Sequence, residues 1–153
     1  MPNPALLTDI ALRLVDSRAL SIYRARRSDR RQVLGRRGVV TRDFELVSDR
    51  DNLAQAIRIR LLTPRGELTA LGHPDYGSRL PELIGEQRTE TTRNLAKLFV
   101  LEALKQERRI AEVVTVTVDD HPGDRHRIDL FVQVRPIGES AVVDVGPFTL
   151  DLG

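Results

Sequence analysis

Residues 43–118 constrain the fold most, because within them the spacing of apolar side chains changes from that of helices to that of a strand. Apolar residues over 50–62 recur at helical spacing, and Pro64 ends this first helix because it pushes the preceding residue out of helical conformation. A second helix is predicted over 87–107, and the alternating valines and threonines of 113–118 predict a strand. This order of elements indicates an α+β domain.

The second predicted helix has the widest apolar stripe of the chain, made of Leu95, Leu98, Phe99, Leu101, Ala103 and Leu104. A stripe of this width predicts the best-buried helix. Leu53, Ala54, Ile57 and Leu61 form one face of the first helix. Ser48 and Asp51 have the spacing of a capping box at its start.

A turn and a loop join the two predicted helices. Thr63-Pro64-Arg65-Gly66 suits a type I turn, with proline at the second place and glycine at the fourth. The loop over 72–85 is rich in glycine and proline but also holds Leu80, Leu83 and Ile84. We therefore expect it to be ordered and packed against the body.

The remaining strand signals predict a small antiparallel or mixed sheet packed against the two helices. Residues 39–47 alternate, with Phe44 and Leu46 facing inward, and residues 126–135 alternate with Phe131 as the one apolar residue on the polar face. Residues 141–145 and 148–152 predict one broken strand or two short ones, with Phe148, Leu150 and Leu152 alternating to the end. We expect this last strand at a sheet edge, where unpaired backbone groups are available to a partner.

The N-terminus predicts an amphipathic helix over 4–16. Asn3 followed by Pro4 is a favourable helix start. Leu6, Leu7, Ile10, Ala11 and Leu14 then fall on one helical face. This helix either packs on the protein's own core or docks on a partner.

An arginine-rich stretch follows, with seven arginines over 24–37 and little apolar periodicity. Residues 1–42 carry a net charge of +7 and residues 43–153 a net charge of −5, which predicts an exposed basic arm on an acidic body. The arm is either a solvated loop or a contact for an acidic protein surface. Nucleic acid is a less favoured partner, because Tyr23 is the one nearby aromatic residue for base stacking. We divide the chain into 1–38, helix and arm, and 39–153, the α+β domain.

Composition argues against an enzyme. The chain has no cysteine, its three histidines have no zinc-site spacing, and it has no glycine-rich phosphate loop, so we expect no metal, cofactor or small-molecule substrate. Paired carboxylates would be the remaining catalytic option, and Glu67, Asp75 and Glu82 are the candidates. We expect no membrane insertion, because no run of apolar residues is long enough to span a bilayer.

Several short motifs in residues 40–120 resemble, in order and spacing, the GPW family of phage baseplate wedge proteins, also called sheath initiators. The matching residues are Asp43-Phe44-Glu45-Leu46, Asn52-Leu53, Gln55-Ala56-Ile57, Arg60-Leu61-Leu62-Thr63, Gly66-Glu67, Pro74-Asp75-Tyr76-Gly77-Ser78 and Glu107-Arg108-Arg109-Ile110. The match covers about half of the chain.

The resemblance implies a structural part of a contractile injection system: a phage tail, a tailocin or an extracellular contractile particle. Such proteins assemble in the cytoplasm into a hexameric baseplate, bind wedge proteins and tube or hub proteins, and template the first sheath ring by β-strand addition. This role agrees with a sheet edge left open for a partner. The N-terminal helix would then join the wedge proteins.

The family has a Glu-Pro-Arg signature at the end of the second helix, and here Glu107 and Arg109 keep its charged ends while Arg108 replaces the proline. A proline would end the helix, so with Arg108 we expect the helix to run one residue further. Glu107 and Arg109 either bind partner chains or fasten the helix end to the sheet by a salt bridge within the chain.

Some members of this family have carried the name lysozyme. A peptidoglycan hydrolase of a tail baseplate, using Glu67 or Asp75, is therefore the alternative function.

Overall fold

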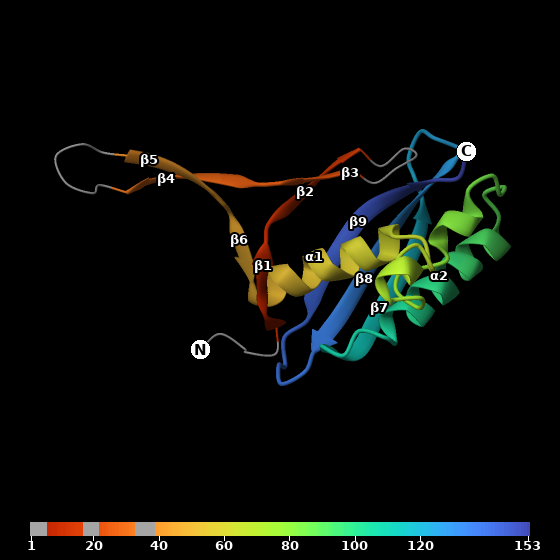
Figure 1. Ribbon diagram of the computed structural model, residues 1–153. Coiled ribbons are helices and arrows are strands. Elements are labelled where there is room, and N and C mark those ends of the chain that lie inside the picture. Colours follow the sequence, from red (N-terminus) through yellow and green to blue (C-terminus); the bar gives the residue numbers. More distant parts are fainter. Residues whose placement is uncertain (1–5, 17–21, 33–38) are drawn as a thin grey trace.

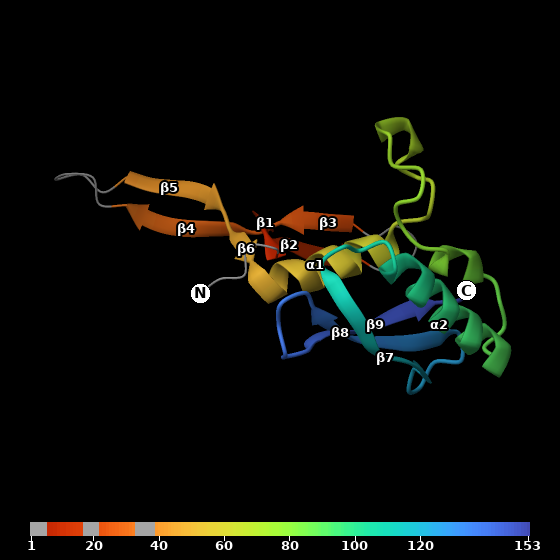
Figure 2. The ribbon, with the colours of Figure 1, turned by 90° about the horizontal axis from the view of Figure 1, so that it is seen from below.

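The structure, a computed structural model, describes residues 6–16, 22–32 and 39–153. Two long helices, α1 (Asp49–Leu62) and α2 (Glu90–Leu104), pack against a three-stranded antiparallel sheet, which confirms the predicted α+β class. The sheet has the order β7 (Ile110–Asp120), β8 (Arg127–Pro136), β9 (Val143–Asp151). Figures 1 and 2 show both helices on one side of the sheet, with α1 over β9 and α2 beside β7.

The central strand β8 has the predicted alternation. Ile128, Leu130, Val132 and Val134 face the helices and are fully buried, while Phe131 lies on the other face. The C-terminal strand is a single strand at a sheet edge, as expected, and its pairing with β8 is interrupted between Phe148 and Val145. The buried side chains of the two helices and the three strands form one continuous core.

The helix ends differ from the prediction. Ser48 precedes α1 but makes no capping hydrogen bond, so the predicted capping box is wrong. The second helix is capped by Thr89, whose hydroxyl accepts from the backbone N–H of Thr92 at 3.1 Å. It ends at Leu104 rather than at 107, so the expected extension past Glu107 is also wrong.

The loop between the helices is ordered, as predicted, and contains two 3₁₀ turns, η2 (Thr69–Leu71) and η3 (Leu80–Leu83). Leu80 and Leu83 are buried, but Ile84 is exposed. The turn after α1 begins one residue later than predicted: Glu67 donates its backbone N–H to the carbonyl of Pro64, and Gly66 takes a positive φ of 87°. The carbonyl of Thr63 instead accepts from Ser78.

The N-terminal part is built of strands, so the helix predicted over 4–16 is wrong for the described residues from 6 onward. It forms three two-stranded antiparallel ribbons. These pair β1 (Thr8–Ile10) with β6 (Leu46–Ser48), β2 (Leu12–Asp16) with β3 (Ile22–Ala25), and β4 (Arg27–Gln32) with β5 (Val39–Phe44). The arginine-rich arm is thus largely a hairpin rather than an irregular loop. Residues 1–5, 17–21 and 33–38, including Asn3 and Pro4, lie outside the described residues.

The three ribbons meet at one junction, closed by a ring of backbone hydrogen bonds. Ala11 donates to Glu45 at 2.7 Å, Glu45 donates to Arg26 at 2.9 Å, and Arg26 donates to Ala11 at 2.8 Å. Ala11 is buried, and the side chains of Arg26 and Glu45 form an ion pair at 3.0 Å. Each chain segment therefore bends at the junction without leaving these backbone groups unpaired.

Two side chains of α1 fasten the junction to the body. The buried Asn52 donates to the carbonyl of Leu6 at 2.8 Å. Gln55 accepts from the backbone N–H of Leu12 at 2.7 Å and donates to the carbonyl of Ile10 at 2.9 Å. The side chain of Leu6 lies in the main core. The start of the chain is therefore held by both polar and apolar contacts.

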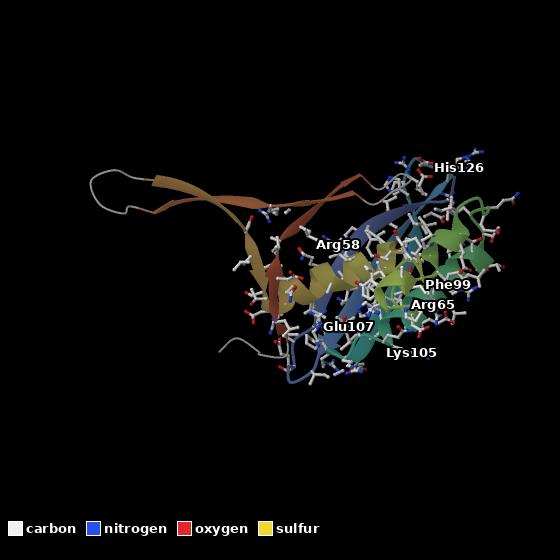
Figure 3. The ribbon with its side chains drawn as sticks, in the orientation of Figure 1. Arg58, Arg65, Phe99, Lys105, Glu107 and His126 are labelled. Carbon is white, nitrogen blue, oxygen red and sulfur yellow. The ribbon has the colours of Figure 1, made fainter. Side chains whose placement is uncertain are left out.

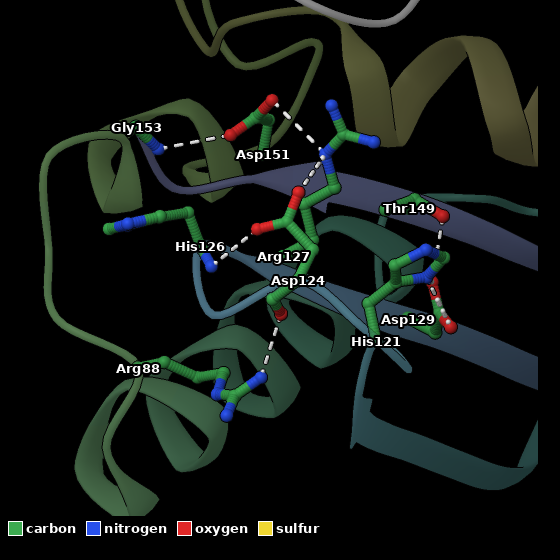
Figure 4. A network of polar contacts seen from close by, with 9 residues as sticks. All are labelled: Arg88, His121, Asp124, His126, Arg127, Asp129, Thr149, Asp151 and Gly153. Carbon is green, nitrogen blue, oxygen red and sulfur yellow. Dashed lines mark hydrogen bonds and ion pairs between the residues drawn. The ribbon is translucent and has the colours of Figure 1, made fainter.

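Polar residues tie the far end of the sheet together (Figure 4). Asp129 on β8 accepts hydrogen bonds from Thr149 at 2.7 Å and pairs with His121 at 2.9 Å. Arg127 lies between Asp124 and Asp151, at 3.2 and 3.3 Å. These contacts hold the β7–β8 hairpin against β9. No helix in the described ranges is long and apolar enough to cross a membrane.

Candidate functional site

The outer edge of β7 is open along most of its length. Across 111–119, backbone hydrogen bonds within the described part of the chain run to β8 only. The opposite edge, β9, is less accessible to a partner, because Pro147 has no backbone N–H and Gly85 donates to Leu152 just past its end. Of the two borders, β7 is the better template for an added strand.

One row of α2 residues runs along β7. Arg93 forms an ion pair with Asp120 at the end of β7, at 2.8 Å. Lys97 and Leu101 follow at intervals of four residues and so continue on the same side of the helix. The elements α2 and β7 are consecutive and run in opposite directions (Figure 1). The last turns of α2, which include Leu101, therefore lie toward the beginning of β7.

The apolar side chains of β7 next to this row are not fully buried. Ile110, Val113 and Val116 face the helices but are only half-buried, whereas Val132 and Val134, their neighbours on β8, are fully buried. Leu101, on the neighbouring helix, is 38% exposed. A strand paired with β7 could place an apolar side chain against Leu101 and Val113 and so extend the core.

The predicted burial of the α2 stripe is partly wrong. Phe99, Ala103 and Leu104 are buried as expected, but Leu95, Leu98 and Leu101 are 38%, 47% and 38% exposed. The apolar stripe of α2 is wider than the part of the helix that packs against the sheet and its other neighbours. Leu101 follows Arg93 and Lys97 at intervals of four residues on the flank nearer β7, and Leu98 lies about 60° further round the exposed side of the helix.

A second cluster lies between the end of α1 and the start of β7, and Glu107 is its centre (Figure 3). Arg109 donates to Glu107 at 2.8 Å, and the guanidinium of Arg60 from α1 lies 3.6 Å from the same carboxylate. The guanidinium of Arg60 also stacks over the ring of Tyr76, 4.4 Å from its centroid. These side chains are 9% (Glu107), 11% (Arg60) and 17% (Arg109) exposed.

The two arginines of this cluster determine the protonation state of Glu107. Burial by itself would raise the pKa of Glu107, but the hydrogen bonds from Arg109 and the charges of Arg109 and Arg60 outweigh burial and leave that pKa below its usual value. Burial raises the pKa of Tyr76. Glu107 is therefore an ionised group that links α1, the end of α2 and β7.

The structure thus brings Glu107 and Arg109 into a salt bridge within the chain, one of the two roles considered for them. Arg108 between them is exposed. Arg60 and Tyr76 belong to the sequence motifs, but nothing in the sequence indicates that they form part of a site. Only their convergence in space, through the turn after α1, reveals the cluster.

The N-terminal residues predicted to contact partners have different surroundings in the structure. Leu7 and Ile10 are exposed beside the β1–β6 ribbon, while Leu6 is buried in the core. The backbone of Leu14 lies in β2, and its side chain lies outside the described part. Leu46, expected to face inward, is exposed, and the side chain of Phe44 also lies outside the described part.

The side chains of Phe148 and Leu150 on β9, and of Leu152 just after it, lie in the core. A partner at that edge would therefore meet their backbone rather than their side chains.

The candidate catalytic carboxylates do not form a pair with one another. Asp75 and Glu82 each pair with a different arginine at the surface. Asp75 pairs with Arg65 at 3.0 Å, and Glu82 accepts from Arg79 at 2.8 to 3.1 Å. Glu67 is exposed. The hydrogen bond from Arg79 lowers the pKa of Glu82, which is opposite to the shift that a general acid of a glycosidase needs. No group of three or more metal-ligating side chains occurs within the residues described.

A protein of Geobacter sulfurreducens provisionally named a tail lysozyme has a crystal structure similar to this chain, with a TM-score of 0.55 and 29% sequence identity. The similarity covers 65% of this chain and 89% of that chain. No protein-family model and no curated protein matches the sequence. The chain thus has the fold of a protein that carries a tail-related name, and about a third of it lies outside the match.

Proposed function

We propose that the protein is a structural, non-enzymatic component of the baseplate of a phage tail or a related contractile particle. On this proposal, the free edge of β7 binds a strand of the sheath protein and templates the first sheath ring. The tail-related name of the structural neighbour and the order of the GPW-like motifs support this assignment. Wedge proteins and tube or hub proteins of the same particle would be the other partners.

The observation that carries the proposal is the free edge of β7, where backbone groups are unpaired with described residues and the apolar side chains are only half-buried. Its backbone groups can supply main-chain hydrogen bonds, which give affinity in strand addition. The half-buried Val113 and Val116 and the exposed Leu101 can supply the pockets that fix the register of the added strand. The Glu107 cluster joins the end of α1 to the segment between α2 and β7, and so helps to fix where α2 lies beside this edge.

A single substitution in α2 tests this site. Replacing Leu101 with glutamate should weaken binding of the sheath protein by at least about tenfold, because a charge would replace an apolar contact worth about 1.4 kcal/mol or more. Leu98→Glu is the matched control, since it makes the same change on the same helix but on the side away from the sheet. Binding can be measured by calorimetry or by co-purification with the sheath protein of the same particle.

Two results would count against the docking site: equal weakening by Leu98→Glu and Leu101→Glu, or no effect of either. Thermal unfolding of each variant checks that the fold is kept, and we expect little change because both side chains are partly exposed.

The name of the structural neighbour also supports a rival function, a peptidoglycan hydrolase. On the structural proposal, purified protein leaves peptidoglycan intact. Clearing of peptidoglycan that is lost in Glu67→Gln or Asp75→Asn would favour the hydrolase instead.

A further inference from the structure

The β1–β6 ribbon lies at the start of α1 and carries three exposed aliphatic side chains (Figure 1). Leu46 is 65% exposed, Leu7 is 62% exposed and Ile10 is 38% exposed. Ile10 and Leu46 are directly opposed in the register of the ribbon, so they share one face. Leu7 immediately precedes β1. We call these three side chains the β1–β6 apolar surface.

The backbone at one end of the ribbon is strained. Leu7 has a φ of 58°, in the left-handed region that a bulky side chain rarely adopts. Asp49 has a φ of 53° and donates its backbone N–H to the carbonyl of Leu7 at 3.2 Å. Strained backbone of this kind is concentrated at binding sites and switches. A leucine that is held in such a conformation and left exposed is therefore a candidate contact residue.

The β1–β6 apolar surface is also fixed in place. Leu6, next to Leu7, is buried in the core, and its carbonyl accepts from Asn52 of α1 at 2.8 Å. The carbonyl of Ile10 accepts from Gln55 of α1 at 2.9 Å. The surface can therefore meet a partner without first being ordered, which lowers the entropic cost of binding.

The side chains of the ribbon are more available to a partner than its backbone at Ile10. The N–H of Ile10 donates to the carboxylate of Asp9 at 2.7 Å, and its carbonyl is bonded to Gln55. Strand addition needs unbonded main-chain groups, whereas docking of an amphipathic helix uses apolar side chains. These contacts favour a helix as the partner of this surface.

Three aspartates border the β1–β6 apolar surface. Asp9 is next to Ile10, Asp49 follows β6, and Asp51 lies in the first turn of α1. None of the three makes an ion pair within 4 Å with the residues that the structure describes. The N-terminus of α1 favours acidic residues at 49 and 51, but it gives no reason for Asp9.

Two described arginines lie beside the ribbon and do not neutralise these aspartates. Arg26 pairs with Glu45 at 3.0 Å, and Arg50 pairs with Glu139 at 2.6 Å. The border of the apolar surface therefore has an excess of negative charge. A partner with basic residues around an apolar stripe complements it.

We propose that the β1–β6 apolar surface docks a basic amphipathic helix of another protein. Apolar side chains of that helix cover the three aliphatic side chains, and its lysines or arginines pair with the three aspartates. The contact is separate from strand addition at β7 and does not depend on the proposed function.

Methyl NMR of the full chain with a defined probe tests the proposal. The probe is a peptide of about 15 residues made of leucine and lysine at helical spacing, and its counterpart has glutamate in place of lysine. The leucine–lysine peptide should shift the methyl signals of Leu7, Ile10 and Leu46. It should not shift those of Leu71, which is 72% exposed on the loop between the helices. The leucine–glutamate peptide should bind at least about tenfold more weakly.

A matched pair of variants locates the contact. Leu46→Ser should weaken binding of the leucine–lysine peptide by at least about tenfold, because it removes an apolar contact. Leu71→Ser makes the same change at a leucine that is also exposed, and should weaken binding less than about twofold. Thermal unfolding should be nearly unchanged in both variants, because neither side chain is buried.

Any of four results would overturn the proposal. One is no binding of the leucine–lysine peptide, and another is equal binding of the two peptides. A third is equal weakening by Leu46→Ser and Leu71→Ser, or methyl shifts centred on Leu101 instead of the ribbon. The fourth is concentration-dependent shifts of Ile10 and Leu46 without peptide that Leu46→Ser removes, which would make a second copy of this chain the occupant.

Discussion

Replacing Gly77 with alanine should lower the free energy of unfolding by about 3 kcal/mol or more. Gly77 has a φ of 102° and crosses the turn after α1 so closely that an added Cβ would lie 2.5 Å from the carbonyl oxygen of Thr63 and 2.8 Å from that of Pro64. Both obstacles are backbone atoms. The turn would therefore have to open, and the contacts of its neighbours would weaken with it.

The crossing at Gly77 matters because it positions the residues on either side. Ser78 donates its backbone N–H to the carbonyl of Thr63 at 2.8 Å and its hydroxyl to that of Leu61 at 2.5 Å, and Tyr76 lies under Arg60. Chemical denaturation measures the effect. Gly72→Ala is the control, because Gly72 also has a positive φ, 84°, but an added Cβ there meets nothing within 4 Å, so we expect a loss of only about 1–2 kcal/mol.

Replacing Glu107 with glutamine should cost about 3 kcal/mol, the second large effect that we expect. The change keeps the shape of the side chain but removes the charge between Arg60 and Arg109, leaving two mostly buried guanidinium groups without their carboxylate. The buried Nε of Arg60 already has no hydrogen-bond partner in the described residues. The loss of the carboxylate charge would therefore leave Arg60 still less well compensated. Asp75→Asn, which breaks the exposed ion pair with Arg65, is the control and should cost less than about 1 kcal/mol.

The cost of Glu107→Gln should also depend on pH. The pKa of Glu107 is lower in the folded protein than its usual value of 4.5, so its contribution to stability is present above that value and is lost as the pH falls through the folded pKa. The difference in unfolding free energy between wild type and variant should therefore shrink below about pH 4.5. A difference that stays constant down to pH 3 would mean that the charge of Glu107 does not stabilise the fold.

The C-terminal half of the fold follows from local sequence patterns. The alternation of Ile128, Leu130, Val132 and Val134 has a single interpretation, a strand with one buried face, and the structure confirms it. Pro64 marks the end of α1 equally well, because its effect on the preceding residue is local.

The N-terminal ribbons could not be predicted in this way. Leu6, Leu7, Ile10 and Ala11 fit helical spacing, but in the structure Leu6 enters the core, Ala11 is enclosed by the junction, and Leu7 and Ile10 are exposed. Their conformation depends on pairing with residues more than thirty positions away, such as Ile10 with Leu46. Pairing partners over such distances decide strand formation, and single-sequence periodicity does not contain them.

The candidate site was predictable only in part. The sequence correctly placed the last strand at a sheet edge but did not indicate which edge a partner would use. The advantage that we propose for β7 depends on Pro147 and on the contact of Gly85 with Leu152 beside β9. The width of the leucine stripe was a usable signal. Leu95, Leu98 and Leu101 extend the apolar surface of the helix beyond the part that the sheet can bury, so they stay exposed. The Glu107 cluster needed the tertiary fold, since Arg60, Tyr76 and Glu107 come from three separate segments.

Hydrogen exchange of the backbone amides, with and without the sheath protein, tests the central claim most directly. In the free protein, the β7 amides that face away from β8 should exchange quickly, because they have no backbone partner in the described part of the chain. Sheath protein should protect those amides within 111–119 and leave the amides of β9 unchanged. Protection confined to β9, or no protection of either edge strand in a complex that demonstrably forms, would contradict strand addition at β7.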